Sequence, residues 1–209
     1  MGRIIDISQP VSTTTAVWPG DQPCEIDWTM RRTRGDSVNV AALTLSAHTG
    51  THVDGPFHFE DDGGRPADLA LDAFVGRAIV IDASGAAEIG EDRVEGVDIG
   101  KEGRILFRTR DRIDSGRFPS SFAAITPGLA RRLGEAGARL VGTDSPSVDP
   151  VDSKTLDTHR ILARNGVAIL ENLVLADVEP GRYTLVALPL RLVDADSSPV
   201  RAVLIEGML

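Results

Sequence analysis

The chain has 209 residues, which is enough for one domain to bury a substantial core without disulfide bonds. Its net charge of −9 argues against nucleic acid as a partner, because binding to phosphates depends on clustered Lys and Arg. The single cysteine excludes an internal disulfide and fits a reducing compartment. No stretch approaches the roughly 18 consecutive apolar residues of a membrane span, and the first residues lack the apolar region of a secretion signal. We therefore expect a cytoplasmic protein without a membrane partner.

The predicted elements follow one another without a linker, a repeat or a low-complexity segment. In the first half, β-branched runs predict strands at residues 3–7, 38–47, 78–82 and 105–108, and a helix is expected at residues 67–74. A second helix begins at Thr126, whose hydroxyl can cap it ahead of Pro127, and ends at Gly137. The second half adds strands at residues 138–142, 167–170, 183–190 and 200–206, with a helix at residues 156–164. This order predicts one α/β domain over residues 1–209, with a mixed β-sheet core and few flanking helices.

One segment gathers the residue types that bind metal ions. From His48 to His58 the sequence His-Thr-Gly-Thr-His-Val-Asp-Gly-Pro-Phe-His holds three of the chain's four histidines and an aspartate. Imidazole nitrogens and carboxylate oxygens are the ligands that zinc and similar divalent ions prefer. A polar turn whose side chains satisfy backbone groups would not account for this density. The segment therefore predicts a metal site.

The backbone of this segment is expected to be extended and turning rather than helical. Gly50 disfavours a helix and Pro56 would break one. In an extended chain, side chains two positions apart share a face, which suits His52 and Asp54. A turn at Gly50 can bring His48 to the same ion. These three ligands would leave an open position for water, as in catalytic zinc sites.

Completing a site for two ions would require ligands from elsewhere in the chain. Asp54 can bridge two ions, and the candidates for the second are His159 in the predicted helix and Glu171 at the end of a predicted strand. Taken alone, His159 and Glu171 also fit surface positions. His58 lies beyond the proline, where we expect it to face the substrate; the alternative is a structural histidine that caps the turn.

Two further residues carry open alternatives. Trp18, before Pro-Gly, can contact an aromatic substrate or pack a loop over the core. Asp144 can support the metal ligands or form an Asx-turn before Ser145-Pro146.

The histidine segment closely resembles the signature HxGTHxDxPxHF of the cyclase family of metal-dependent hydrolases. Other stretches resemble the bacterial kynurenine formamidases of that family, in the same order along nearly the whole chain: Trp18-Pro-Gly-Asp21, Gly142-Thr-Asp-Ser-Pro-Ser-Val-Asp149, Asp157-Thr-His159, Ala168-Ile-Leu-Glu-Asn172, Ala187-Leu-Pro-Leu190 and Ser198-Pro-Val-Arg-Ala-Val203. The resemblance implies the family's swivelling β/β/α fold and a homodimer. It also implies hydrolysis of the linear amide N-formyl-L-kynurenine to L-kynurenine and formate, in tryptophan degradation by the kynurenine pathway.

The same resemblance implies a role for each candidate residue. His48, His52 and Asp54 would hold a first zinc ion and His159 a second, with Asp54 and Glu171 bridging both. Mn²⁺ or Co²⁺ are alternatives to Zn²⁺ in such a ligand set. His58 would be the general acid and base of the reaction. Trp18 would contact the aromatic part of the substrate.

Two other functions remain open at the level of sequence. Another cyclase-family amide hydrolase, such as one that opens the cyclic amide isatin, would use the same ligands. A non-catalytic metal-binding protein would bind the ions but leave His58 without a task.

Overall fold

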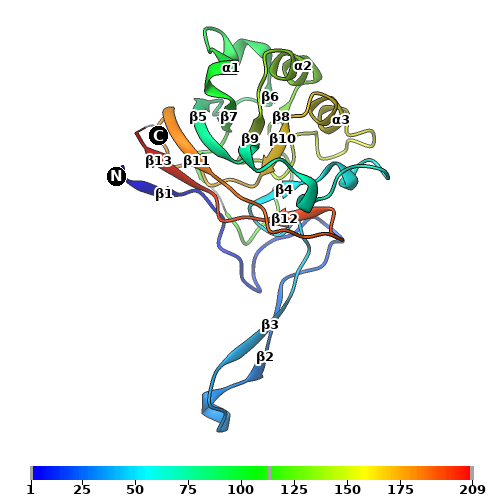
Figure 1. The fold of residues 1–209 in the computed structure, drawn as a ribbon, viewed down its shortest axis with the longest axis vertical. Helices are drawn as coiled ribbons and strands as arrows, with labels where there is room; N and C mark the ends of the chain where they lie inside the picture. Colours follow the sequence, from blue (N-terminus) through cyan, green and yellow to red (C-terminus); the bar gives the residue numbers. More distant parts are fainter. Residues whose placement is uncertain (1, 113, 208–209) are drawn as a thin grey trace.

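The protein is described by a computed structural model that covers residues 2–112 and 114–207. Figure 1 shows a body of sheet and helices from which one long hairpin projects. Within the described residues, the main sheet has nine strands, in the order β1 (Ile4–Asp6), β13 (Val203–Glu206), β11 (Gly181–Val186), β5 (Val75–Asp82), β7 (Arg104–Arg108), β9 (Leu140–Thr143), β10 (Ala168–Glu171), β4 (His52–Asp54) and β12 (Ser197–Pro199).

The sheet is mixed. Its middle strands β5, β7, β9 and β10 run parallel, and all other neighbours pair antiparallel. Parallel strands are normally covered on both faces, so their sequences are apolar on both sides. In β7, for example, Ile105 and Phe107 face one core while Leu106 faces the other, and all three are fully buried.

Helices cover one face of this sheet (Figure 1). They are α1 (Ile99–Glu102), α2 (Pro127–Glu135) and α3 (Asp157–Arg164). Helix α2 begins where the sequence predicts, because the Thr126 hydroxyl accepts a hydrogen bond from the backbone N–H of Leu129 at 3.2 Å. Leu129 and Leu133 of α2 pack with Leu162 of α3 against the sheet.

The opposite face of the sheet forms a second core. This core joins Val53 of β4 to Leu170 of β10, and also to Leu185 and Leu204 at the other side of the sheet. Strands near the two opposite edges of the nine-stranded sheet contribute to one cluster because the twisted sheet curls over this face. Because Val53 of β4 faces this second core, its neighbours His52 and Asp54 point to the helical face of the sheet.

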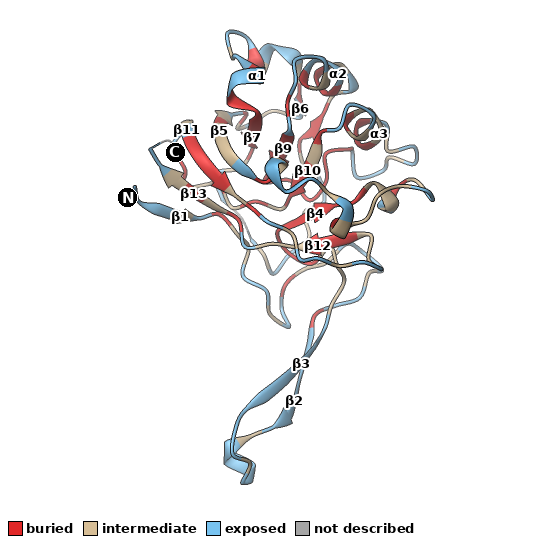
Figure 2. Cartoon of the chain, viewed as in Figure 1, coloured by how far each residue is buried: buried red, intermediate tan, exposed pale blue. Residues whose placement is uncertain are grey.

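Two small strand pairs lie outside the main sheet. The pair β6 (Glu88–Ile89) and β8 (Ala124–Ile125) is parallel and buried in part. The pair β2 (Glu25–Met30) and β3 (Val40–Thr44) is an antiparallel hairpin, here called the arm, and every residue of both strands is exposed. Figure 2 shows the arm pale blue along its length, clear of the body.

The predicted fold class is confirmed, but one of the predicted helices is wrong. The helix expected at residues 67–74 is replaced by two 3₁₀ turns, Pro66–Asp68 and Leu71–Ala73, because Leu69 and Ala70 have extended backbone between them. Further 3₁₀ turns lie at Arg32–Arg34, Pro56–His58 and Glu91–Val94. The strand expected at residues 183–190 ends at Val186, and β2, β6, β8, β12 and helix α1 were not predicted. Strand β4 lies where the sequence analysis expected extended chain. No helix in the described part of the chain has the length and apolar character needed to cross a membrane.

We expect Thr126→Ala to lower the free energy of unfolding by about 1 kcal/mol, because the N-cap hydrogen bond to Leu129 is lost. Urea denaturation followed by circular dichroism measures the change. Thr155→Ala is the matched control, since Thr155 is exposed and its hydroxyl has no hydrogen bond among the described residues. Equal midpoints for the two variants would contradict the assigned cap.

Candidate metal centre

The centre of the site is the carboxylate of Asp54, in strand β4 next to the edge strand β12. Asp54 is 4% exposed, and neither of its oxygens has a hydrogen-bond partner among the described residues. Its Oδ1 lies 3.1 Å from Nδ1 of His48 and 3.4 Å from Nε2 of His52. Its Oδ2 lies 3.4 Å from Nε2 of His159. A buried carboxylate without hydrogen bonds is costly, so this position favours a cation between the carboxylate and the three imidazoles.

Glu171 is a second carboxylate placed between two of these histidines. Its Oε2 lies 3.5 Å from Nε2 of His52, and its Oε1 lies 3.5 Å from Nε2 of His159. Oε1 also accepts a hydrogen bond from the backbone N–H of Val148 at 2.7 Å. Like Asp54, Glu171 therefore presents one oxygen to each side of the site.

Strand pairing explains why these residues meet. His52 and Asp54 are two positions apart in β4, so both side chains lie on one face. Antiparallel pairing of β4 with β10 places Glu171 directly opposite His52. His48 reaches the same point from the preceding turn, where Gly50 has a left-handed backbone (φ 68°). His159 comes from the first turn of α3, over the helical face of the sheet.

In each of the three histidines, one ring nitrogen is held by the protein and the other faces Asp54. Nδ1 of His52 lies 2.8 Å from the carbonyl oxygen of Gly50. Nδ1 of His159 lies 2.6 Å from Asp149, and Nε2 of His48 lies 2.9 Å from Asp196. Metal-binding histidines in proteins are oriented in this way, because the outer hydrogen bond fixes the tautomer and the ring plane.

The charges of the site balance through shared protons when no cation is present. Burial opposes charge on His48, but the neighbouring carboxylates of Asp196 and Asp54 raise its pKa to about 9. Burial likewise opposes charge on His52, and Asp54 and Glu171 raise its pKa to about 10. Protons on these imidazoles take the place that a metal ion can occupy, and a binding ion displaces them.

Two groups of three donors meet the spacing of a metal site, with the ligand atoms of each group within 4.8 Å of one another. The groups are His48, His52 and Asp54, and Asp54, His159 and Glu171. Nitrogen and carboxylate donors in this number fit a divalent metal ion. The structure thus brings together all five residues that the sequence proposed as ligands.

His58 lies beside these ligands and does not face Asp54. It comes from the 3₁₀ turn Pro56–His58, its side chain is 34% exposed, and its Nδ1 lies 3.1 Å from Oδ2 of Asp196. The ring centres of His58 and His48 are 4.3 Å apart. A third donor group, His48, His58 and Asp196, also meets the spacing criterion.

Two carboxylates of the site were missed by reading the sequence. Asp196 precedes β12 and binds His48 and His58, which are 148 and 138 positions away. Asp149 orients His159 through its ring and its backbone N–H. No spacing signal marks either residue, although Asp149 ends one of the stretches quoted above. Asp144 does not contact the ligands: its oxygens accept hydrogen bonds from Thr109 and Arg110.

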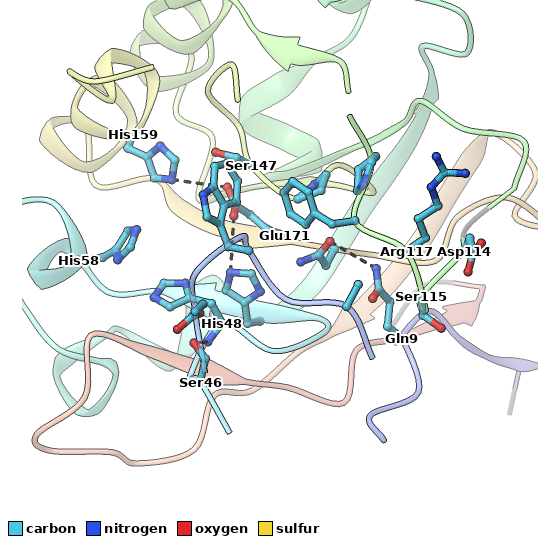
Figure 3. Close-up of a pocket in the computed structure, with 18 of the residues that line it drawn as sticks. Gln9, Ser46, His48, His58, Asp114, Ser115, Arg117, Ser147, His159 and Glu171 are labelled. Atoms are coloured by element: carbon cyan, nitrogen blue, oxygen red, sulfur yellow. Dashed lines mark hydrogen bonds and ion pairs between the residues drawn. The ribbon is translucent and has the colours of Figure 1, made fainter. Parts of the chain in front are cut away.

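The site opens into a cavity of about 530 Å³. His48, His52, His58 and His159 line it together with Trp18. The indole of Trp18 is 38% exposed and packs edge-on against Phe118, with ring centres 5.0 Å apart, and against Phe122 at 6.3 Å. Figure 3 shows His48, His58 and His159 on one side of the cavity and Asp114 and Arg117 on the other.

Comparison with known proteins gives the family of the chain. The sequence profile of the cyclase family matches residues 5–150. The chain belongs to the cyclase family. A cyclase-family relative, a kynurenine formamidase of Bacillus mycoides (strain KBAB4), is 46% identical over 200 residues, which cover 96% of each chain.

Solved structures of the cyclase family share the fold. One described as a potential metal-dependent hydrolase with cyclase activity has a TM-score of 0.86 and 28% identity, and the match covers all of both chains. Isatin hydrolase A from Labrenzia aggregata, bound to benzyl benzoate, has a TM-score of 0.82 and 24% identity over 97% of this chain and 93% of that one. The second likeness concerns the fold alone.

We expect Zn²⁺ to raise the melting temperature of metal-free protein, because an ion that binds only the folded state adds about 2.7 kcal/mol at 100 times its Kd. Asp54→Ala should remove this increase, since Asp54 belongs to both donor groups. Differential scanning calorimetry measures both. Asp62→Ala, at an exposed position, is the control and should respond like the parent chain; a normal response of Asp54→Ala would show that the ion binds elsewhere.

Proposed function

We propose that this chain is a kynurenine formamidase, which hydrolyses N-formyl-L-kynurenine to L-kynurenine and formate in tryptophan degradation. The observation that carries the proposal is the buried carboxylate of Asp54, whose two unpartnered oxygens face three imidazoles at the end of an open cavity. The 46% identical formamidase supports the choice of substrate. We propose that residues 1–209 form one catalytic domain that acts in the cytoplasm.

In this proposal the site holds two zinc ions. His48, His52 and Asp54 would hold the first, and His159 would hold the second, with Asp54 and Glu171 available to both. Asp54 and Glu171 each place one oxygen near His52 and the other near His159, which supports this assignment of ligands to two ions. When bound, divalent ions of this kind lower the pKa of water toward neutrality and stabilise negative charge that develops on a carbonyl oxygen.

His58 is proposed to move the protons of the reaction. Its Nδ1 is held by Asp196, so Nε2 is the nitrogen that remains for the substrate. It can take a proton from the attacking water and deliver it to the aniline-type nitrogen of the formamide. The C–N bond then breaks, and formate and a neutral amine leave. The carboxylate of Asp196 would stabilise the imidazolium between the two transfers.

Trp18 is proposed to hold the aryl ring of the substrate. Phe118 and Phe122 contact the indole and fix its orientation, while more than a third of its surface stays exposed. A rigid aromatic surface can position the formamide near the histidines.

We expect the purified, zinc-loaded protein to hydrolyse N-formyl-L-kynurenine, as followed by the absorbance of kynurenine. His58→Ala should lower kcat by about 10²- to 10⁴-fold, the usual contribution of a general acid or base. Metal analysis should find the zinc content of this variant unchanged.

Asp61→Ala, at an exposed position of the same segment, is the matched control and should keep full activity. Loss of zinc from His58→Ala would instead make His58 a ligand. Turnover of isatin without turnover of N-formyl-L-kynurenine would replace the proposal by the cyclic-amide alternative. Bound metal without turnover of either would favour a non-catalytic metal-binding protein.

The partner in solution is proposed to be a second copy of the chain. The pairing of the arm places Ile26 opposite Leu43 and Trp28 opposite Ala41, so these apolar residues share one face. Asp27 and Ala42 lie on the other face. An isolated two-stranded hairpin is marginally stable in water, so its apolar face needs cover.

The net charge of the chain and the exposed apolar residues of its body favour a second copy as the partner that covers the arm. The tip of the arm carries Arg31, Arg32 and Arg34, whereas the whole chain has a net charge of −9. A copy of the same chain therefore offers an acidic surface to a basic tip. Exposed apolar side chains on the body, Leu188, Leu190 and Val193, offer a surface for the apolar face.

We expect Trp28→Asp combined with Leu43→Asp to convert a dimer to a monomer, because charge would enter the apolar face of the arm. Sedimentation equilibrium measures the mass. Ala42→Lys, on the opposite face, is the control and should remain dimeric. A parent chain that sediments as a monomer would contradict the proposed partner.

A further inference from the structure

The end of the cavity away from the histidines carries positive charge. Arg110 and Arg117 line the cavity, and both also line an adjoining hollow together with Asp114 and Pro119. These residues therefore form one wall. Figure 3 shows Arg117 and Asp114 on the side opposite His48 and His58.

Neither arginine has an ion-pair partner within hydrogen-bond reach among the described residues. Nη2 of Arg110 is buried and has no hydrogen bond. Asp144 acts on the guanidinium of Arg110 through space, but its oxygens accept hydrogen bonds from Thr109 and from the backbone N–H of Arg110. Burial lowers the pKa of Arg110, and Asp144 opposes that effect. A buried guanidinium nitrogen without an acceptor is costly, which leaves a place for an anionic ligand group.

The layout of the cavity matches the layout of an aryl formamide that carries an amino acid. In N-formyl-L-kynurenine the formamide and the amino-acid side arm are attached to neighbouring positions of one ring, and the ketone and methylene carbons of the side arm separate its carboxylate from the formamide. The histidines occupy one end of the cavity, and Trp18 supplies an aromatic wall. The arginines occupy the other end, where a carboxylate would receive the forked hydrogen bonds that guanidinium groups form best.

We propose that Arg110 and Arg117 bind the α-carboxylate of the substrate's amino-acid group, with Asp114 beside them for the ammonium. This inference rests on the proposed formamidase function. It makes the arginine end a specificity site that acts in binding, far from the bond that is broken. Cyclic amides without an amino-acid group, such as isatin, would gain nothing from it.

The test compares two aryl formamides, N-formyl-L-kynurenine and 2-formamidoacetophenone, which keeps the ring, ketone and formamide but lacks the amino acid. Arg110→Gln and Arg117→Gln should each raise KM for N-formyl-L-kynurenine by about 10- to 100-fold with little change in kcat, the effect of losing a charged hydrogen bond made before and during the reaction. KM for 2-formamidoacetophenone should stay at the parent value, which also reports that the variants are folded.

Arg112→Gln is the matched control, because Arg112 is exposed and lines the adjoining hollow without lining the cavity. Arg110→Lys should recover part of the loss, since charge is kept while the fork is lost. Titration calorimetry with the product L-kynurenine and with 2-aminoacetophenone gives the same comparison without turnover.

An equal rise in KM for both formamides would show that the arginines have a structural role and would overturn the inference. Unchanged KM values in both variants would also overturn it. A parent enzyme that hydrolyses neither formamide would refute the formamidase function itself. Preferential binding of L-kynurenine that depends on Arg110 would still support the carboxylate site in that case.

Discussion

The whole site depends on the burial of one carboxylate without hydrogen bonds. Asp54 is surrounded by protein, and imidazole nitrogens of three histidines lie within 3.4 Å of its oxygens, which have no hydrogen bond among the described residues. In the interior the free energy of such an anion is unfavourable unless positive charge lies next to it. Its two oxygens face different histidines, so the compensating charge is required on both sides. Protons can supply that charge, and a bound metal cofactor can supply it in their place.

The surrounding fold fixes the positions of the side chains that lie next to this carboxylate. Strand β4 has three residues and is paired on both edges, with β10 on one side and β12 on the other. Pairing with β10 brings Glu171 into the site, and pairing with β12 brings Asp196 beside His48. The backbone carbonyl of Asp196 also accepts a hydrogen bond from Gly55. Rings and carboxylates held in this way need little reorganisation when a ligand binds.

The two ends of the cavity differ in the kind of side chain that lines them. Its histidine end contains the candidate metal ligands and the proposed proton carrier His58, while the guanidinium groups at its arginine end have no ion pair among the described residues. The arm begins and ends at the rim of this cavity, because Asp21 and Ser46, which line it, flank the two arm strands. Ser46 in turn accepts a hydrogen bond from the backbone N–H of His48. The arm is therefore only a few residues from the candidate ligand His48 in the sequence.

The sequence by itself determined the metal-binding chemistry and most of the regular elements. Short β-branched runs and the Thr126 cap are local signals, and the density of imidazoles between His48 and His58 has no other simple explanation. The tertiary structure decided which distant residues complete the site, since Glu171, Asp149 and Asp196 are placed by strand pairing and helix packing rather than by spacing. It also decided how the extended His52–Asp54 segment is paired, and it decided β12, whose Ser and Pro residues have little strand preference and are held by β4. Local propensity acts over a few residues, whereas the balance of buried charge around Asp54 is settled by side chains more than a hundred positions apart.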